Sequence, residues 1–144
     1  MSERILIKKE IIHVMEKDKK NSILVVEDDT ALRKVLNDKL SDEGFEVYEA
    51  VDGEQGLKLA TEKHPSIILL DIFMPIMDGV TMLSKLRSSG AWGKHVLVLV
   101  LTNSIDAQTI AKVSGLGATD FLIKSEWSLE ALVERIRERV KAQK

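Results

Sequence analysis

Carboxylate side chains follow two apolar stretches that have the composition of buried strands. Glu27 and Asp28 come directly after "SILVV" (22–26), and Asp71 comes directly after "SIILL" (66–70). If the two stretches are neighbouring parallel strands, the three carboxylates lie together, where like charges raise one another's pKa unless a cation is present. Hard cations take oxygen ligands, and Mg²⁺ is commonly held by one or two carboxylates together with water and phosphate. These residues therefore indicate a Mg²⁺ site.

A hydroxyl and an ammonium group follow two further apolar stretches. Thr102 comes after "HVLVLVL" (95–101), and Lys124 ends "TDFLIK" (119–124). Taken singly, they have ordinary explanations as a turn hydroxyl and a solvated lysine. Together with a carboxylate nucleophile such as Asp71 and a metal ion, they are the groups needed to move a phosphoryl group onto an aspartate. The combination favours phosphoryl transfer over the separate ordinary explanations.

The elements that must position these groups alternate along the chain. Five predicted strands are separated by helical patterns, which is typical of an open parallel sheet covered by helices on both faces. Right-handed crossovers leave few strand orders, and we expect the flavodoxin-like order 2-1-3-4-5 of a single doubly wound α/β domain. In that order strands one and three are neighbours at the topological switch point, where such sheets bind ligands. The predicted strands cover residues 22–26, 45–50, 66–70, 95–101 and 119–124.

The predicted helices are marked by capping residues. Residues 30–42 form an amphipathic helix capped by Asp29 or Thr30, with an apolar stripe made of Leu32, Val35, Leu36 and Leu40. Further helices are predicted after Asp52, after Asp78, over residues 104–114 and after Ser128. Trp92 and Trp127 are predicted in loops.

Composition excludes several classes of protein. The chain has 144 residues, a formal net charge of -2 and no cysteine, so thiolate chemistry and disulfides are ruled out. Neither a membrane-spanning apolar stretch nor a signal peptide is found, and no excess of basic residues points to nucleic acid. We expect a cytoplasmic protein with no direct contact to membranes or nucleic acid.

From residue 22 onward the chain resembles a response-regulator receiver domain of two-component signalling, similar to chemotaxis regulators. The motifs "ILVVEDD" (23–29), "LLDIFMPIMDG" (69–79), "LT" (101–102) and "FLIK" (121–124) occur in the family's order and spacing. The resemblance implies that Asp71 is the phosphoacceptor and that Thr102 and Lys124 bind phosphoryl oxygens. It implies Mg²⁺ as the cofactor, held by Asp28 and Asp71, by Glu27 through water and by the backbone carbonyl of Phe73.

The resemblance also implies partners and a switch. The donor would be a sensor histidine kinase or a histidine phosphotransfer protein, and only self-phosphorylation and self-dephosphorylation chemistry is expected, not that of an enzyme. Thr102 and Phe121 would couple phosphorylation to a surface made of residues 104–116, strand five and the last helix, which receivers use for effector proteins or homodimers. Since the chain ends with that helix, we expect no output domain on it.

Three features depart from the family pattern. Ser125 replaces the usual proline after Lys124, so we expect a trans peptide bond there. Phe73 lies two residues after the acceptor, where an apolar ring would hinder the hydrolytic water. Residues 1–20 precede the expected receiver domain of residues 21–144. They are read as an amphipathic helix with Ile7, Ile11 and Val14 or Met15 on one stripe, or as an added strand at "RILIKK". Their role is either that of a solvated extension or that of a docking or dimerisation helix.

Two alternatives come from other functional classes. One is an aspartyl-nucleophile, Mg²⁺-dependent phosphohydrolase. Such enzymes carry an acid/base residue two positions after the nucleophile, but here that position is occupied by Phe73, which cannot act as an acid or base. The other is a receiver-fold binding module that acts without phosphorylation, an alternative that Ser125 leaves open.

Overall fold

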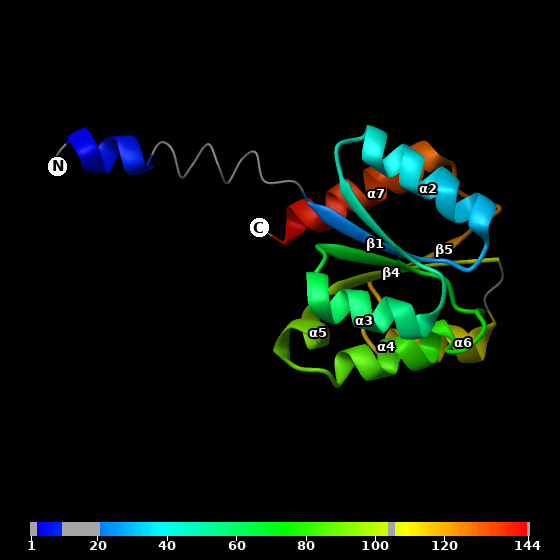
Figure 1. Cartoon of the computed structure of the whole chain (residues 1–144). Coiled ribbons are helices and arrows are strands. Elements are labelled where there is room, and N and C mark those ends of the chain that lie inside the picture. The colour runs from blue at the N-terminus through cyan, green and yellow to red at the C-terminus, as the bar shows by residue number, and fades with distance from the viewer. Residues whose placement is uncertain (1–2, 10–20, 104–105, 144) are drawn as a thin grey trace.

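Five strands form one parallel sheet in the order β2-β1-β3-β4-β5, which confirms the predicted topology. The structure is a computed structural model and describes residues 3–9, 21–103 and 106–143 (Figure 1). Consecutive strands are joined by helical crossovers, as expected for a parallel sheet. The strands are β1 (Ser22–Val26), β2 (Glu46–Ala50), β3 (Ile67–Leu70), β4 (Leu97–Thr102) and β5 (Asp120–Ile123).

Helices cover both faces of the sheet (Figure 1). They are α2 (Thr30–Asp42), α3 (Gly53–Lys63), α4 (Gly79–Arg87), α5 (Ala91–His95), α6 (Ala107–Gly115) and α7 (Leu129–Ala142). Side chains of α2 and α7, such as Leu36 and Ile136, pack against Ile23 and its neighbours on one face of the sheet. Side chains of α3, α4 and α6 pack on the other face, around Leu24. The near-continuous apolar strands follow from this burial on both sides.

The predicted capping residues begin four of the helices. Asp29, Asp52, Asp78 and Ser128 each accept a hydrogen bond from a backbone N–H in the first turn, over 2.8 to 3.1 Å. Such caps are each worth about 1 kcal/mol. For α2 the cap, Asp29, comes three residues after the end of β1, so Glu27 and Asp28 lie between the strand and the helix.

Three expectations about local structure were wrong. Val35 is 46% exposed, because Leu36 and Leu40 face the sheet, with Leu32 partly buried beside them. Helix α6 begins at Ala107 with Asp106 as its cap, and residues 104–105 lie outside the described residues. Trp92 lies in the short helix α5 and not in a loop.

Helix α5 escaped prediction because "SGAWGKH" has the composition of a loop. Gly93 lies so close to α4 that a Cβ there would be 2.3 Å from the carbonyl oxygen of Leu86. Glycine is therefore required by close packing and not by a turn. The ring of Trp92 stacks on His64 at a centroid distance of 4.2 Å.

Residues 3–9 are helical, so the alternative of an added strand in this segment was wrong. Ile5, Leu6 and Ile7 are exposed on this helix. The remaining positions of the predicted stripe, Ile11 and Val14 or Met15, lie outside the described residues. Among the described residues, no helix has both the length and the apolar character needed to cross a membrane.

Candidate functional site

The strand register places the acidic residues side by side. Val26 of β1 pairs with Leu70 of β3, so Glu27 and Asp71 follow two paired residues at the same edge of the sheet. The backbone N–H of Asp71 donates to the carbonyl of Val26 over 3.0 Å, which continues the ladder into the site. One carboxylate oxygen each of Glu27, Asp28 and Asp71 lies within 4.8 Å of the others. The predicted acidic cluster is therefore present.

The three carboxylates fit a divalent ion of the Mg²⁺ type. Glu27 and Asp71 are buried, at 2% and 6% exposure, whereas Asp28 is exposed. An all-oxygen donor set with an open side is what Mg²⁺ uses when water and phosphate complete its coordination. Glu27, Asp28 and Asp71 are thus the residues that would hold the ion.

Lys124 places a positive charge beside these carboxylates. Its ammonium lies 3.4 Å from Oδ2 of Asp71 and also pairs with Oε1 of Glu27. Burial by itself would lower the pKa of Lys124, but hydrogen bonding to Glu27 and the charge of Asp71 raise it above the usual value. The lysine therefore stays charged at the centre of the acidic group.

Burial and the ion pair with Lys124 shift the pKa of Glu27 in opposite directions. Burial raises the pKa of Glu27 to about 7, against the lowering effect of the hydrogen bonds from Lys124 and from the backbone N–H of Asp29. The nearby charge of Asp71 contributes to this raised pKa. An additional cation would stabilise the charged form of this carboxylate, in agreement with the donor set described above.

The turn after Asp71 is held by backbone contacts. The N–H of Ile72 donates to Oδ1 of Asp71 over 2.8 Å, and the N–H of Gly79 donates to the carbonyl of Ile72 over 2.8 Å. A Cβ on Gly79 would lie 2.3 Å from the carbonyl oxygen of Asp71, so only glycine permits this approach. The N–H of Met77 bonds to the carbonyl of Pro75 over 2.7 Å around Ile76. Backbone contacts and close packing thus support the position of Asp71.

Two large apolar side chains of this turn face solvent. Phe73 is 59% exposed and Ile76 is 78% exposed. Phe73 also lines a hollow of about 240 Å³ together with Thr81 of α4 and with Thr109 and Lys112 of α6. The hollow therefore separates the turn after Asp71 from α6, and Phe73 is part of its lining.

The ends of β4 and β5 complete the edge of the sheet. Thr102 is fully buried, and its carbonyl accepts a hydrogen bond from the N–H of Lys124 over 2.8 Å. Phe121 pairs in register with Val100 and packs, partly buried, against the apolar cluster under α4 and α6. The Lys124–Ser125 bond is trans. The described structure therefore brings Lys124 into contact with the acidic cluster and ties Thr102 to it through the backbone.

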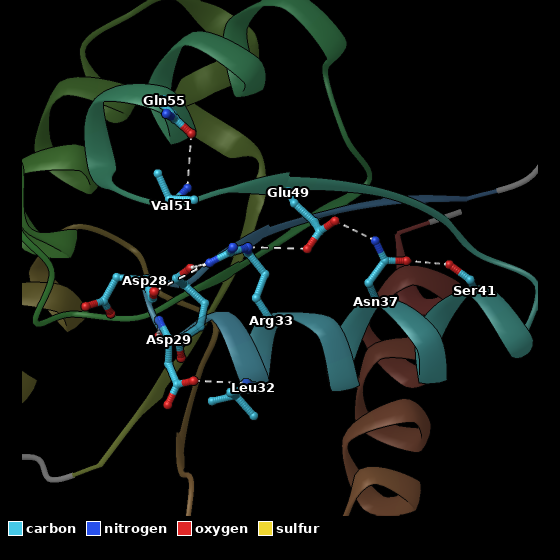
Figure 2. A network of polar contacts seen from close by, with 10 residues as sticks. Asp28, Asp29, Leu32, Arg33, Asn37, Ser41, Glu49, Val51 and Gln55 are labelled. Carbon is cyan, nitrogen blue, oxygen red and sulfur yellow. Dashed lines mark hydrogen bonds and ion pairs between the residues drawn. The ribbon is translucent and has the colours of Figure 1, made fainter.

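Arg33 also holds the acidic turn, and the sequence alone did not reveal this. From the first turns of α2 its Nη1 donates to the carbonyl of Glu27 over 2.8 Å, and its Nε lies 3.3 Å from Glu49 of β2 (Figure 2). Asn37 donates to the same Glu49 over 2.8 Å. A positive residue one turn into a helix that follows an acidic strand end is the only signal the sequence offered.

Comparison with known proteins agrees with this geometry. The family model of the response regulator receiver domain matches residues 23–137. The transcriptional regulatory protein PrrA of Mycobacterium tuberculosis is 42% identical over 119 residues, which cover 80% of this chain and 48% of PrrA. The probable transcriptional regulator ycf27 of Porphyridium aerugineum is 33% identical over 84% of this chain and 50% of its own length. The chain spans about half the length of these curated relatives.

Solved structures show the same fold. A CheY-like receiver domain protein from Methanospirillum hungatei superposes with a TM-score of 0.81 at 26% identity, over 87% of this chain and 97% of the other. CheY in a CheX-CheY-BeF3-Mg complex from Borrelia burgdorferi gives a TM-score of 0.73 at 26% identity, over 82% and 87% of the two chains. The resemblance inferred from the motifs is confirmed, and the chain belongs to the response regulator receiver domain family.

Proposed function

We propose that Asp71 accepts a phosphoryl group from a phosphohistidine of a partner protein, in a Mg²⁺-dependent reaction that switches a protein-binding surface. The observation that carries the proposal is the contact of Lys124 with Asp71 and Glu27 beside the exposed Asp28. One nucleophilic carboxylate, further oxygen ligands and one nearby cation are the groups that phosphoryl transfer to an aspartate requires. The donor would be a sensor histidine kinase or a histidine phosphotransfer protein.

The reaction forms a bond between a carboxylate oxygen of Asp71 and phosphorus while the bond from phosphorus to the imidazole nitrogen breaks. The nitrogen keeps the electron pair and is protonated as it leaves. Oδ1 of Asp71 already accepts a hydrogen bond from Ile72, so Oδ2, beside Lys124, is the oxygen we assign as nucleophile. Mg²⁺, when bound, would neutralise charge on the transferred group.

Lys124 and Thr102 act on the product of this reaction. The ammonium of Lys124 lies where it can bind a phosphoryl oxygen, and the Thr102 hydroxyl would bind another after moving toward it. Because the carbonyl of Thr102 is bonded to the N–H of Lys124, such a movement pulls on β5 and on the chain that leads to α6. We propose that α6, β5 and α7 form the surface read by an effector protein or by a second copy.

The site argues for a switch and not for a hydrolase that acts on a diffusible substrate. Position 73, where an acid/base carboxylate would be needed, holds an exposed phenylalanine. We propose that residues 21–144 form the receiver unit, that residues 1–20 are an extension of it, and that the protein works in the cytoplasm. A shorter chain without residues 1–20 should fold, and its mass in solution compared with the full chain tests for dimerisation through that segment.

Labelling with acetyl phosphate and Mg²⁺, followed by intact mass, tests the central proposal. We expect a gain of about 80 Da in the wild type and none in Asp71→Asn, because the amide is not a nucleophile. Asp78→Asn is the matched control, since Asp78 is a helix cap outside the cluster, and it should still be labelled. A wild type that stays unlabelled while a control receiver reacts, or label retained by Asp71→Asn, would refute the proposal.

A further inference from the structure

Arg87, at the carboxyl end of α4, ties two separate segments together through their backbone. Its Nη1 donates to the carbonyls of Gly93 and Val96 over 2.9 and 2.8 Å. Its Nε donates to the carbonyl of Leu116 over 2.7 Å, and its Nη2 donates to that of Gly117 over 3.0 Å. All four acceptors are carbonyl oxygens, and two of them belong to the turn between α6 and β5.

This contact suits an arginine in particular. The guanidinium is a planar group with five donors in fixed directions, whereas a lysine ammonium is a compact point charge. The carbonyls at the end of a helix carry partial negative charge, so a cation beside Leu116 is also favoured by the dipole of α6. Gly117, with a φ of 74°, lets the chain turn directly after this carbonyl.

The two ends of α6 are held very differently. Val113 is its one buried residue, and it lies in the last turn. The N–H of Gly117 donates to Ser114 and that of Ala118 to Val113, over 2.9 and 3.0 Å. The first turn of α6, from Ala107 to Ile110, has no buried side chain. The helix is therefore attached to the domain mainly at its carboxyl end.

We propose that Arg87 is a positioning residue that fixes the carboxyl end of α6. On phosphorylation the helix then turns about a pivot at Leu116 and Gly117. The inference rests on the proposed function of Asp71. When Thr102 moves toward the phosphoryl group, the amino end of α6 is displaced first. The contacts of Arg87 hold the carboxyl end of the helix in place. The displacement is therefore largest at the exposed amino end of α6, which includes Ile110. The turn that leads into β5 stays in position.

Hydrogen exchange followed by mass spectrometry on the full chain tests the pivot. Beryllofluoride with Mg²⁺ serves as the probe that imitates the phosphoryl group, with fluoride and Mg²⁺ alone as the reference. In the wild type we expect beryllofluoride to alter amide exchange over residues 106–111 and to leave residues 115–118 unchanged. In Arg87→Met the alteration should spread through residues 115–118. Arg87→Lys should give a smaller spread, because one ammonium cannot reach all four carbonyls.

The control is Lys85→Met, which removes a positive charge from the same last turn of α4. It should behave like the wild type. Equal alteration of both ends of α6 in the wild type, or confinement to residues 106–111 in Arg87→Met, would overturn the pivot while leaving the function of Asp71 intact. No response to beryllofluoride anywhere around Asp71 would instead refute the proposed function and the pivot with it. If Arg87→Met does not fold, the wild type still tests the pivot and Arg87→Lys still tests the part that Arg87 has in it.

Discussion

The ammonium of Lys124 lies 3.4 Å from Oδ2 of Asp71 and pairs at the same time with Glu27. One lysine thus neutralises part of an acidic cluster that also includes Asp28. The ammonium of Lys124 lies where it could bind a phosphoryl oxygen. In that position it is also beside the carboxylate oxygens that would bind a metal ion. Lys124 should therefore favour phosphoryl transfer while it opposes metal binding.

Lys124→Gln should bind Mg²⁺ more tightly and accept a phosphoryl group more slowly. Two unit charges about 4 Å apart interact by about 4 kcal/mol at an effective dielectric constant of 20. Even after screening by solvent, removal of the repulsion should tighten Mg²⁺ binding by roughly tenfold. The fluorescence of Trp127, which lines a hollow together with Lys124, gives the affinity, and intact mass gives the rate of labelling.

Lys39→Gln is the matched control, because Lys39 pairs with Glu43 and Glu130 away from the site. Its affinity for Mg²⁺ should equal that of the wild type. An unchanged or weaker Mg²⁺ affinity in Lys124→Gln would show that the lysine does not compete with the ion.

Features set by near neighbours in the chain could be predicted from the sequence. Apolar runs such as residues 22–26 define strands, and the caps Asp29 and Ser128 act within one helical turn, so both are visible in a short window. The location of Glu27 and Lys124 at one edge of the sheet could also be predicted, because strand order places the carboxyl ends of parallel strands together, but their direct contact was not predicted. This location follows from the predicted strand order and not from any single motif.

Contacts made by long side chains with distant backbone could not be predicted. Arg87 bonds to carbonyls 29 and 30 residues further along the chain, and carbonyls carry no mark in the sequence. Arg33 holds the carbonyl of Glu27 in the same way. Helix α5 was missed because Gly93 is needed for close packing, which composition does not distinguish from a flexible loop. These features depend on the assembled fold.

Phe73→Asn should shorten the lifetime of the phosphorylated protein. The side chain of Phe73 is 59% exposed two residues after Asp71, and we expect its ring to exclude the water that attacks phosphorus. An amide would admit that water and could orient it, so we expect hydrolysis to be roughly tenfold faster, which corresponds to about 1.4 kcal/mol in the barrier. The measurement is the decay of the labelled mass after acetyl phosphate is removed.

Thr81→Ala provides the comparison for Phe73→Asn. Thr81 lines the same hollow from α4, so it reports any general loosening of the region. Its decay rate should match that of the wild type. If Phe73→Asn decayed at the wild-type rate as well, the ring would have no part in the lifetime of the signal.

Ile76→Asn should stabilise the folded protein. Ile76 has a φ of 69°, a left-handed conformation that is unfavourable for a β-branched residue, and its side chain is 78% exposed. Asparagine tolerates this conformation better, and little burial is lost, so we expect the free energy of unfolding to rise by about 1 kcal/mol. Urea unfolding of both proteins gives the value.

Ile110→Asn controls for the exchange of an exposed isoleucine in a residue with ordinary helical conformation. Ile110 lies in α6 and is 39% exposed. This variant should be no more stable than the wild type, because no strain is relieved. Equal stabilisation by both substitutions would contradict the explanation based on backbone strain.

Glu27 should make the protein, in the absence of Mg²⁺, less stable as the pH rises from about 4.5 to 7. Its pKa is raised from 4.5 to about 7 by burial, so in this interval the folded protein retains a proton that the unfolded chain has released. Stability then falls with rising pH, by an amount on the order of 3 kcal/mol at most, given about 1.4 kcal/mol for each pKa unit. Glu27→Gln cannot titrate, so its stability relative to the wild type should increase across the same interval and level off above it. Chemical unfolding of both proteins in chelator from pH 4 to 8 measures that difference, and a difference that stays constant with pH would show that Glu27 is ionised throughout. Saturating Mg²⁺ should reduce the slope, because a bound cation favours the charged carboxylate.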